Sequence, residues 1–199
     1  MKRIVVASAN KGKLKEIWEI LSDMSVELVS MGDLWNPVPD IEENGTTFFD
    51  NAFIKATWVY KKSGMWSLAD DSGLEVDFLN GEPGVFSARY AGKQGDSAAN
   101  NRKLLDALKD VSIEKRTARF RCVIVLKTGE NSFVTADGTC EGTIGFAPSG
   151  NEGFGYDPLF IPAGEKHTMA EISSEKKNTI SHRGNALKKL REKIDELSI

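Results

Sequence analysis

Short apolar runs alternate along the first half of the chain with segments whose apolar residues recur every three or four positions. The runs Lys2–Ser8 and Val26–Ser30 predict strands, and the periodic segment from Gly12 to Asp23 predicts a helix between them. Strands that alternate with helices are typical of an α/β sheet. A second helix, capped by Thr46 or Thr47, is predicted to run to about Lys62, with a buried stripe of Phe49, Ala52, Phe53, Ala56 and Val59 or Tyr60.

The second half predicts more strand than helix. The apolar segment Trp66–Asp71 predicts a core strand that ends at two carboxylates and a turn, and Leu74–Leu79 reads as extended. The runs Arg119–Lys127 and Ser132–Ile144, with turn residues between them, predict an antiparallel hairpin and therefore a mixed sheet. Helices are predicted over Asp96–Lys109 and from about Ser181 to Leu197, the latter burying Ala186, Leu187, Leu190, Ile194 and Leu197.

Composition narrows the class of protein. A chain of 199 residues with 40% hydrophobic content fits one compact unit. A net charge of −3 and a pI near 5.6 argue against a partner that is a nucleic-acid polymer. No export signal and no apolar run of about 20 residues is present, so we expect no membrane association and a cytoplasmic location.

The soft metal ligands are few. Cys122 and Cys140 form no CxxC pattern and are expected to be reduced core thiols, although a hairpin could bring them close. With only two histidines, a zinc site lacks ligands. Any metal is therefore expected to be hard and bound by oxygen, which means Mg²⁺ with Mn²⁺ as a substitute.

The pair Asp70 and Asp71 is the strongest candidate for chemistry, because buried carboxylates need a cation, a proton or water. The alternative is a solvated turn, since Asp, Ser and Gly all favour turns. Successive side chains on a strand point to opposite faces, so the two are not expected to share a proton as a dyad. Strand geometry alone does not choose which carboxylate faces a substrate.

Two further groups suggest phosphate and metal binding in the first half of the chain. Ser8–Lys13 lies between a strand and a helix, where backbone N–H groups and lysines favour an anion, although an ordinary tight turn fits equally. Glu42 could serve a Mg²⁺ ion together with Asp71, or could complement a helix dipole. Asn51 and Lys55 are four residues apart, so both can face one ligand or form a solvated helix face.

Two groups in the last third suggest recognition of a base. Phe154 lies in the glycine-rich loop Gly150–Pro158, where its ring could stack on a base or tuck into a local apolar cluster. Lys177, His182 and Arg183 gather near the start of the last helix. Cations are disfavoured there unless an acceptor attracts them.

Taken in order, these segments closely resemble the inosine triphosphate pyrophosphatase family over nearly the whole chain. The matching residues are Ser8-Ala9-Asn10-Lys11-Gly12-Lys13, Glu42-Glu43-Asn44-Gly45-Thr46-Thr47-Phe48, Asn51-Ala52, Lys55-Ala56, Ala69-Asp70-Asp71-Ser72-Gly73-Leu74, Gly84, Ser87-Ala88-Arg89-Tyr90, Gly153-Phe154-Gly155-Tyr156-Asp157-Pro158, Lys177 and Ser181-His182-Arg183-Gly184. Ser8 and Ala9 depart from the Thr and Gly of many members.

The resemblance implies a single domain over residues 1–199, built as two α/β lobes around a long, curved, mixed sheet with flanking helices and a central nucleotide cleft. It also implies homodimers. The implied reaction is Mg²⁺-dependent hydrolysis of ITP, dITP and XTP to the monophosphate and pyrophosphate, which removes deaminated purines from the nucleotide pool.

By position, the resemblance assigns the general base to Asp71 and the metal to Glu42 and Asp71. Substrate binding falls on the loop Ser8, Ala9, Asn10, Lys11, Gly12 and Lys13, on Lys55 and Ser72, and on a base pocket of Phe154, Gly155, Tyr156, Asp157, Lys177, His182 and Arg183. Donors such as Lys177 and Arg183 suit the six-position oxygen of hypoxanthine and xanthine and clash with the amino group of adenine. The role of Asp70 stays open between orienting lysines and a structural cap.

Two other functions remain alternatives. A related pyrophosphatase would act on modified pyrimidine triphosphates, and a substrate panel separates it from the purine enzyme. A non-catalytic nucleotide-binding module would keep the pocket and lack turnover.

Overall fold

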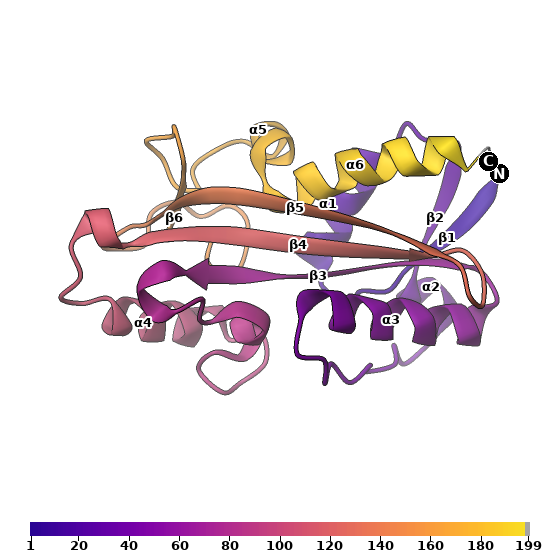
Figure 1. The fold of residues 1–199 in the computed structure, drawn as a ribbon, viewed down its shortest axis with the longest axis horizontal. Helices are drawn as coiled ribbons and strands as arrows, with labels where there is room; N and C mark the ends of the chain where they lie inside the picture. Colours follow the sequence, from indigo (N-terminus) through magenta and orange to yellow (C-terminus); the bar gives the residue numbers. More distant parts are fainter. Residues whose placement is uncertain (198–199) are drawn as a thin grey trace. The chain divides into compact units, whose positions relative to one another are not determined.

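The computed structural model describes residues 1–197 and has a mixed six-stranded sheet in the order β2-β1-β3-β4-β5-β6 (Figure 1). β1 pairs in parallel with both β2 and β3, whereas β5 pairs antiparallel with β6, so the predicted mixed α/β class with flanking helices is confirmed. The elements are β1 Lys2–Val6, α1 Lys11–Leu21, β2 Val26–Ser30, α2 Met31–Leu34, α3 Phe48–Ser63, β3 Trp66–Val76, α4 Ser97–Ala107, β4 Thr117–Lys127, β5 Phe133–Ile144, β6 Phe160–Pro162, α5 Ser174–Ile180 and α6 His182–Glu196, with 3-10 turns at Asp77–Leu79, Gly84–Arg89 and Ile113–Lys115.

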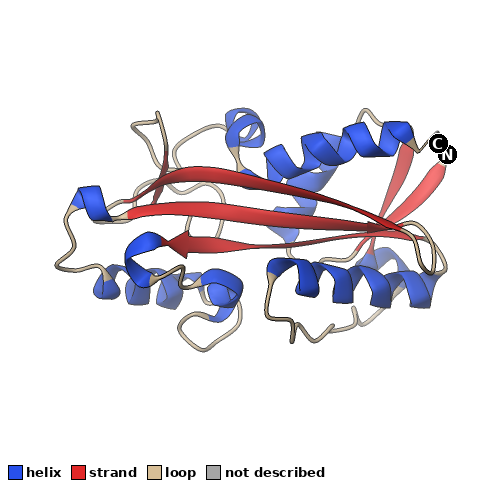
Figure 2. Ribbon diagram, in the orientation of Figure 1, coloured by secondary structure: helices blue, strands red, loops and turns tan. Residues whose placement is uncertain are grey.

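The chain divides into two compact units that each take several segments. Unit 1 contains residues 1–71, 122–138 and the chain from Arg183 onward, and unit 2 contains residues 72–121 and 139–182. The long strands β3, β4 and β5, drawn in red in Figure 2, contribute residues to both units.

In unit 1, alternate residues of the strands face two different apolar clusters. Ile4 and Leu68 pack in one cluster with α1 and α6, whereas Val5 and Ala69 pack in another with α3. Figure 1 accordingly shows α6 and α3 on opposite sides of β3 and β4. Helices on both faces of a sheet form the ordinary three-layer arrangement, in which both faces of the sheet are buried.

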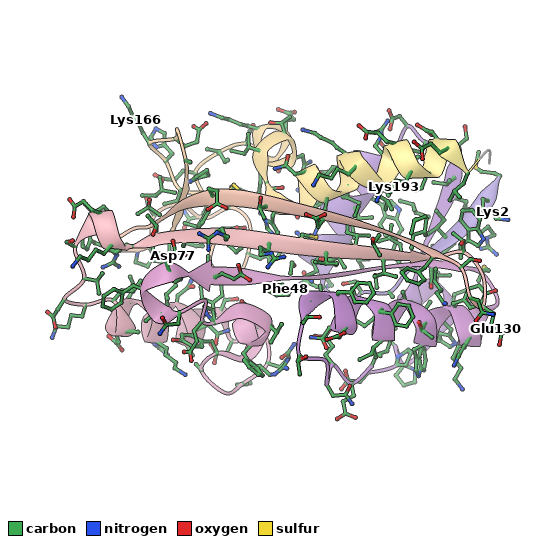
Figure 3. The ribbon with its side chains drawn as sticks, in the orientation of Figure 1. Lys2, Phe48, Asp77, Glu130, Lys166 and Lys193 are labelled. Carbon is green, nitrogen blue, oxygen red and sulfur yellow. The ribbon has the colours of Figure 1, made fainter. Side chains whose placement is uncertain are left out.

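In unit 2, one face of the sheet packs on α4 and the other is polar. Leu74 and Phe120 share the apolar cluster with Leu104 of α4. On the polar side Arg119 pairs with Asp77 at 2.9 Å and with Glu141 at 3.0 Å. Figure 3 labels Asp77 just beyond the end of β3, where this exposed ion-pair ladder begins.

Three predictions about these elements are wrong. The strand predicted to end at Asp71 continues to Val76, because Leu74 and Val76 are fully buried in the core of unit 2 and keep the backbone extended. At the start of α3 the buried phenylalanine is Phe48, labelled in Figure 3 and 5% exposed, rather than Phe49, which is 38% exposed. Leu197 lies beyond the end of α6 and is 40% exposed.

The sequence also missed α2, α5 and β6, which are too short to show a period. Cys122 and Cys140 are buried free thiols, as predicted, and burial raises the pKa of Cys140 to about 11. Within residues 1–197, every helix is too short or too polar to span a bilayer.

Candidate active site

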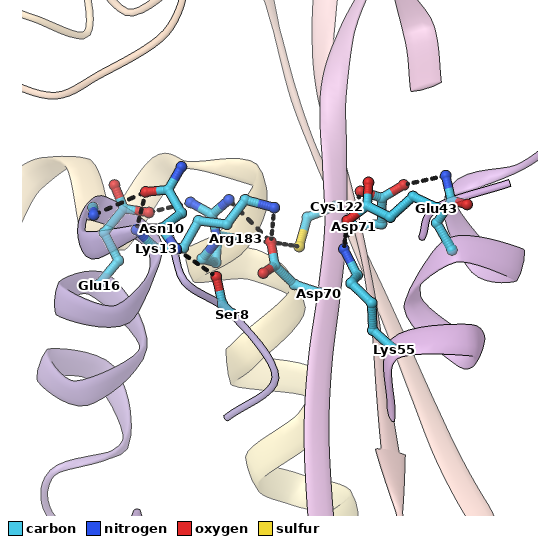
Figure 4. Close-up of polar contacts among 12 residues, drawn as sticks. Ser8, Asn10, Lys13, Glu16, Glu43, Lys55, Asp70, Asp71, Cys122 and Arg183 are labelled. Carbon is cyan, nitrogen blue, oxygen red and sulfur yellow. Dashed lines mark hydrogen bonds and ion pairs between the residues drawn. The ribbon is translucent and has the colours of Figure 1, made fainter. Parts of the chain in front are cut away.

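Asp70 and Asp71 lie in the middle of β3, and their side chains point to opposite faces of the strand (Figure 4). Alternation along β3 explains this, because Asp70 follows Leu68 toward α1 and α6 while Asp71 follows Ala69 toward α3. Both carboxylates are buried, at 1% and 6% exposure. The prediction that they do not form one dyad is confirmed, whereas the solvated-turn alternative is wrong.

On the α3 face, Asp71 has one partner at each oxygen. The Asn51 Nδ2 donates to Oδ2 of Asp71 at 3.1 Å, and the Lys55 Nζ lies 3.4 Å from Oδ1. The same ammonium lies 2.7 Å from Oε1 of Glu43. Asn51 and Lys55 are buried rather than on a solvated helix face, so their four-residue spacing does bring both to one carboxylate.

Burial and charge act against each other in this group. Burial raises the pKa of Asp71 above its ordinary value, with Lys55 and Lys13 opposing and Glu43 adding to the rise. Burial also tends to lower the pKa of Lys55, but attraction to Asp71 and Glu43 outweighs it and leaves this pKa raised. A carboxylate with a raised pKa beside a fixed cation is suited to proton transfer.

The oxygen atoms on this face are of the kind that Mg²⁺ prefers. Lys55 holds the carboxylates of Glu43 and Asp71 together, and the adjacent Glu42 is exposed on the same loop. Mg²⁺ uses one or two protein carboxylates and completes its shell with water and phosphate. Within residues 1–197 no three His, Cys, Asp or Glu side chains cluster closely enough to hold a metal by themselves. The residues therefore fit a magnesium ion shared with a substrate.

On the α1 and α6 face, Asp70 is held by two cations. Lys13 Nζ lies 3.0 Å from Oδ2 of Asp70, and the Arg183 Nε and Nη2 lie 3.2 and 3.1 Å from the same oxygen. Arg183 also pairs with Glu16 of α1, which the sequence analysis did not single out. Burial alone would raise the pKa of Asp70, but Lys13 and Arg183 outweigh it and hold this pKa well below its usual range.

A cation near a helix N-terminus is unfavourable unless acceptors attract it, and Asp70 and Glu16 are these acceptors for Arg183. It is 1% exposed, and both of these partners belong to unit 1. The three-residue spacing of Lys13 and Glu16 on one helix was a signal that could have identified Glu16. That Arg183 contacts a base stays a prediction.

The loop before α1 is shaped by its own hydrogen bonds. Asn10 caps the helix, its Oδ1 accepting from the backbone N–H of Gly12 at 2.9 Å and of Lys13 at 3.2 Å. The N–H of Asn10 donates to Ser8 Oγ at 3.2 Å. The N–H groups of Gly12 and Lys13, which we expected to bind an anion, therefore donate to Asn10 instead. The exposed Lys11 and the ammonium of Lys13 are the sources of positive charge in this loop. Ala9 is exposed beside them.

In unit 2, the glycine-rich loop is folded around Asp157. The Asp157 Oδ2 accepts the N–H of Phe154 at 2.8 Å and pairs with Lys177 Nζ at 2.6 Å. A Cβ on Gly153, whose φ is +77°, would lie 2.1 Å from that oxygen, so only glycine fits. The Lys177 ammonium also lies 4.8 Å from the centre of the half-buried Phe154 ring.

The other predicted residues of unit 2 lie around this loop. Asn101 Nδ2 donates to the carbonyl of Gly155 at 3.1 Å, and the buried Tyr156 hydroxyl donates to the carbonyl of Ser87 at 2.9 Å. His182 is buried and stacks on Phe120, with ring centres 4.7 Å apart. Ser72 is half-buried on β3, next in sequence to Asp71.

The structure therefore collects the predicted residues into two groups. Unit 1 holds residues 8–13, Glu42, Lys55, Asp71 and Arg183, and unit 2 holds Ser72, residues 154–157, Lys177 and His182. The α3 face adds Asn51, which donates to Asp71, and Glu43, which pairs with the same Lys55 ammonium as Asp71.

The fold and the two groups define an α/β protein with a buried carboxylate and lysine site on a mixed sheet. The chain belongs to the Ham1 family, whose model matches residues 4–193, and the resemblance seen in the motifs is confirmed.

Relatives and solved structures of this family match nearly the whole chain. A protein of Desulforamulus reducens named dITP/XTP pyrophosphatase is 50% identical over 197 residues, which is 99% of this chain and 98% of the relative. The structure of a HAM1 protein from Coxiella burnetii has a TM-score of 0.89 at 44% identity and covers 98% of this chain and 100% of that one. The Staphylococcus aureus Ham1 protein gives 0.86 at 40% identity, covering 98% and 99%.

Proposed function

We propose that this protein hydrolyses the deaminated purine nucleoside triphosphates ITP, dITP and XTP to the nucleoside monophosphate and pyrophosphate. The observation that carries the proposal is the buried Asp71, held between Asn51 and Lys55 with a raised pKa. The name dITP/XTP pyrophosphatase, borne by relatives at 48% and 50% identity over nearly the whole chain, supports the substrate class.

In the proposed reaction, Asp71 accepts a proton from a water molecule while the oxygen of that water molecule attacks the α-phosphorus. The bond from that phosphorus to the oxygen bridging to the β-phosphate breaks, and pyrophosphate leaves with the bonding electrons. Lys55 and Lys13 supply positive charge near the phosphates, which matters because phosphoryl transfer depends mainly on positioning and electrostatics. Residues Ser8 to Lys13 and Ser72 would hold the triphosphate and sugar.

Asp71 and Glu42 would hold a Mg²⁺ ion, with Mn²⁺ as a substitute, and Glu43 is a further oxygen donor beside them. When bound, the ion would neutralise negative charge that builds on the phosphates.

The group in unit 2 would recognise the base. Phe154 would stack on the purine, and Lys177 would donate to the six-position oxygen. Gly155 and Tyr156 complete the loop, and Asp157 keeps the Lys177 ammonium at that loop through a 2.6 Å ion pair. His182 and Arg183 remain proposed contacts, while the ion pairs of Arg183 also favour a role in fixing Asp70.

The test is a Mg²⁺ assay over the common, deaminated and modified triphosphates that reads pyrophosphate and orthophosphate separately. The proposal expects pyrophosphate from ITP, dITP and XTP and little product from ATP. Orthophosphate as the first product would exclude this reaction. Turnover of modified pyrimidine triphosphates alone would favour the related enzyme, and binding without product would favour a non-catalytic module. Homodimers and a cytoplasmic location stay predictions.

A further inference from the structure

Asn51 is a buried residue whose side-chain amide is engaged at both ends. Asn51 lies on α3 and is 0% exposed. Its Oδ1 accepts the backbone N–H of Gly45 at 2.8 Å, and its Nδ2 donates to Oδ2 of Asp71 at 3.1 Å. One amide therefore bridges the loop that carries Glu42 and Glu43 to the carboxylate proposed as the base.

The two ends of this amide are not interchangeable. A backbone N–H can be accepted only by the amide oxygen, and an ionised carboxylate can accept only from the amide nitrogen. Gly45 on one side and Asp71 on the other thus fix which way the Asn51 amide points. Because Lys55 lies at the other carboxylate oxygen, Oδ1, the rotation of the Asp71 carboxylate about its Cβ–Cγ bond is also fixed.

Gly45 makes this bridge possible because the loop backbone approaches α3 closely. A Cβ at Gly45 would lie 2.5 Å from Cβ of Asp50 and 2.7 Å from Oδ1 of Asn51. The loop position of Gly45 is two residues beyond Glu43. The placement of the acidic loop against Asp71 therefore depends on Gly45 and Asn51 as well as on the ion pair between Lys55 and Glu43.

We propose that Asn51 is a positioning residue for the reaction, holding the Asp71 carboxylate and the Glu42–Gly45 loop in one fixed arrangement. The inference rests on the proposed function, because Asn51 acts through Asp71. A residue that orients a metal ligand or a base in this way typically changes metal affinity or activity by about 10- to 100-fold when it is replaced.

Two substitutions separate the ends of the amide. Asn51→Leu removes both hydrogen bonds and keeps the number and branching of the side-chain heavy atoms, whereas Asn51→Asp still accepts the Gly45 N–H and loses the donor to Asp71. Asn100→Leu is the matched control, because Asn100 is also a buried helix asparagine, 3% exposed, whose amide bonds backbone groups of Ser87, Ala88 and Ala91. Circular dichroism checks folding, and the readouts are kcat and KM for ITP and the affinity for Mn²⁺ alone, followed by electron paramagnetic resonance.

We expect kcat to fall by about 10- to 100-fold in both Asn51 variants with KM for ITP little changed. Mn²⁺ affinity should weaken by a similar factor in Asn51→Leu and not in Asn100→Leu. Wild-type kcat in a folded Asn51→Asp would overturn the inference even if Asn51→Leu does not fold. Unchanged Mn²⁺ affinity in folded Asn51→Leu, or an equal loss in Asn100→Leu, would overturn it too. Failure of the proposed function looks different, because the wild type would then release no pyrophosphate from ITP.

Discussion

Two adjacent aspartates on one strand have opposite electrostatic environments. Asp70 is matched by Lys13 and Arg183, and its pKa is lowered, whereas Asp71 shares one lysine with Glu43, and its pKa is raised. A carboxylate that is fully compensated is a poor proton acceptor, and one that is only partly compensated is a better one. The residue suited to act as a base is thus Asp71.

Replacing this carboxylate should separate chemistry from binding. Asp71→Asn keeps the size of the side chain but replaces one acceptor oxygen by an NH₂ donor and removes the proton acceptor, so we expect pyrophosphate release from ITP to be abolished. Binding of ITP, measured by titration calorimetry, should be largely kept because the lysines and the unit 2 residues are unchanged. Near-normal turnover in Asp71→Asn would take the role of base away from this residue.

Glu42 and Glu43 can be distinguished by their response to Mg²⁺. If Glu42 binds the ion, Glu42→Gln should raise the Mg²⁺ concentration for half-maximal rate by at least about 10-fold. Glu43→Gln should instead lower kcat with less change in Mg²⁺ dependence, because Glu43 pairs with Lys55 at 2.7 Å. A steady-state Mg²⁺ titration of both variants is the measurement. The reverse pattern would assign the ion to Glu43.

Asp70 should matter for stability in a way that depends on pH. Its folded pKa lies below the ordinary value of about 3.9, so its charge stabilises the fold above that pH and the contribution is lost as the pH falls through the folded pKa. Asp70→Asn leaves the buried Arg183 and the half-buried Lys13 less compensated, which should cost about 3–5 kcal/mol of unfolding free energy at pH 7. Urea unfolding should show this gap narrowing below about pH 4; a gap that does not change with pH would contradict the assignment.

For single residues, the sequence predicted the face of the strand or helix on which a side chain lies better than it predicted which residues that side chain contacts. Alternation correctly separates Asp70 from Asp71, since it depends only on strand geometry. The contact of Arg183 with Asp70 joins residues 113 positions apart, and no local pattern encodes it. Asn51 and Lys55 were ambiguous because four-residue spacing fits a solvated face and a ligand site equally well.

Helix α3 is the element that brings Asn51 and Lys55 to Asp71. Its start is fixed by a capping box in which Thr47 Oγ1 accepts the N–H of Asp50 at 3.1 Å while the Asp50 carboxylate accepts the N–H of Thr47 at 3.0 Å. Its end is fixed by Gly64 in the left-handed region, with a φ of 68°. The cap signal was visible in the sequence and predicted the start within a residue.

Loss of this cap should weaken the element and, through it, the site. Thr47→Ala should lower the unfolding free energy by about 1 kcal/mol, because a helix N–H loses its acceptor. Thr46→Ala is the control, since Thr46 only donates its hydroxyl to Asp50 at 3.3 Å. Urea unfolding compares the two. Equal losses in both variants would show that the box at Thr47 does not set the start of α3.

Two errors at the scale of elements, on α3 and at Asp71 of β3, have one physical origin. The apolar pattern of α3 predicts Phe49 on the buried face, but that face also contains the polar residues Asn51 and Lys55, and the buried phenylalanine at its start is Phe48. The acidic pair likewise predicts a strand end, although the strand continues into the core of unit 2. Buried polar groups that satisfy one another defeat a pattern based on hydrophobicity, and they occur where function places them.

Across the whole molecule the chain passes repeatedly from one unit to the other. It leaves unit 1 after Asp71, returns at Cys122, leaves again at Thr139 and returns at Arg183. The mixed sheet was predictable from local signals. Three of these boundaries fall inside the strands β3, β4 and β5 and the fourth falls in the first turn of α6, and none of them leaves a mark in composition. Neither unit is a continuous segment, so neither can be cut out as one.

Because β3, β4 and β5 each contribute residues to both units, we predict that the two units unfold together. Calorimetry should give one thermal transition whose calorimetric and van't Hoff enthalpies agree, since disrupting either unit frees part of three strands that continue into the other. Two variants sharpen the test. Asp70→Asn weakens unit 1, and Arg116→Leu weakens unit 2 by removing a buried guanidinium that donates to the carbonyls of Leu108, Ile144 and Gly145.

Each variant should lower the same single Tm, by about 2–4 °C for every kcal/mol lost. If the units were independent, each variant would instead move one transition and leave a second at its wild-type temperature. That outcome would also contradict the prediction of a single domain. One shared transition in both variants would mean that a substitution far from Asp71 in sequence can weaken the site through global stability alone.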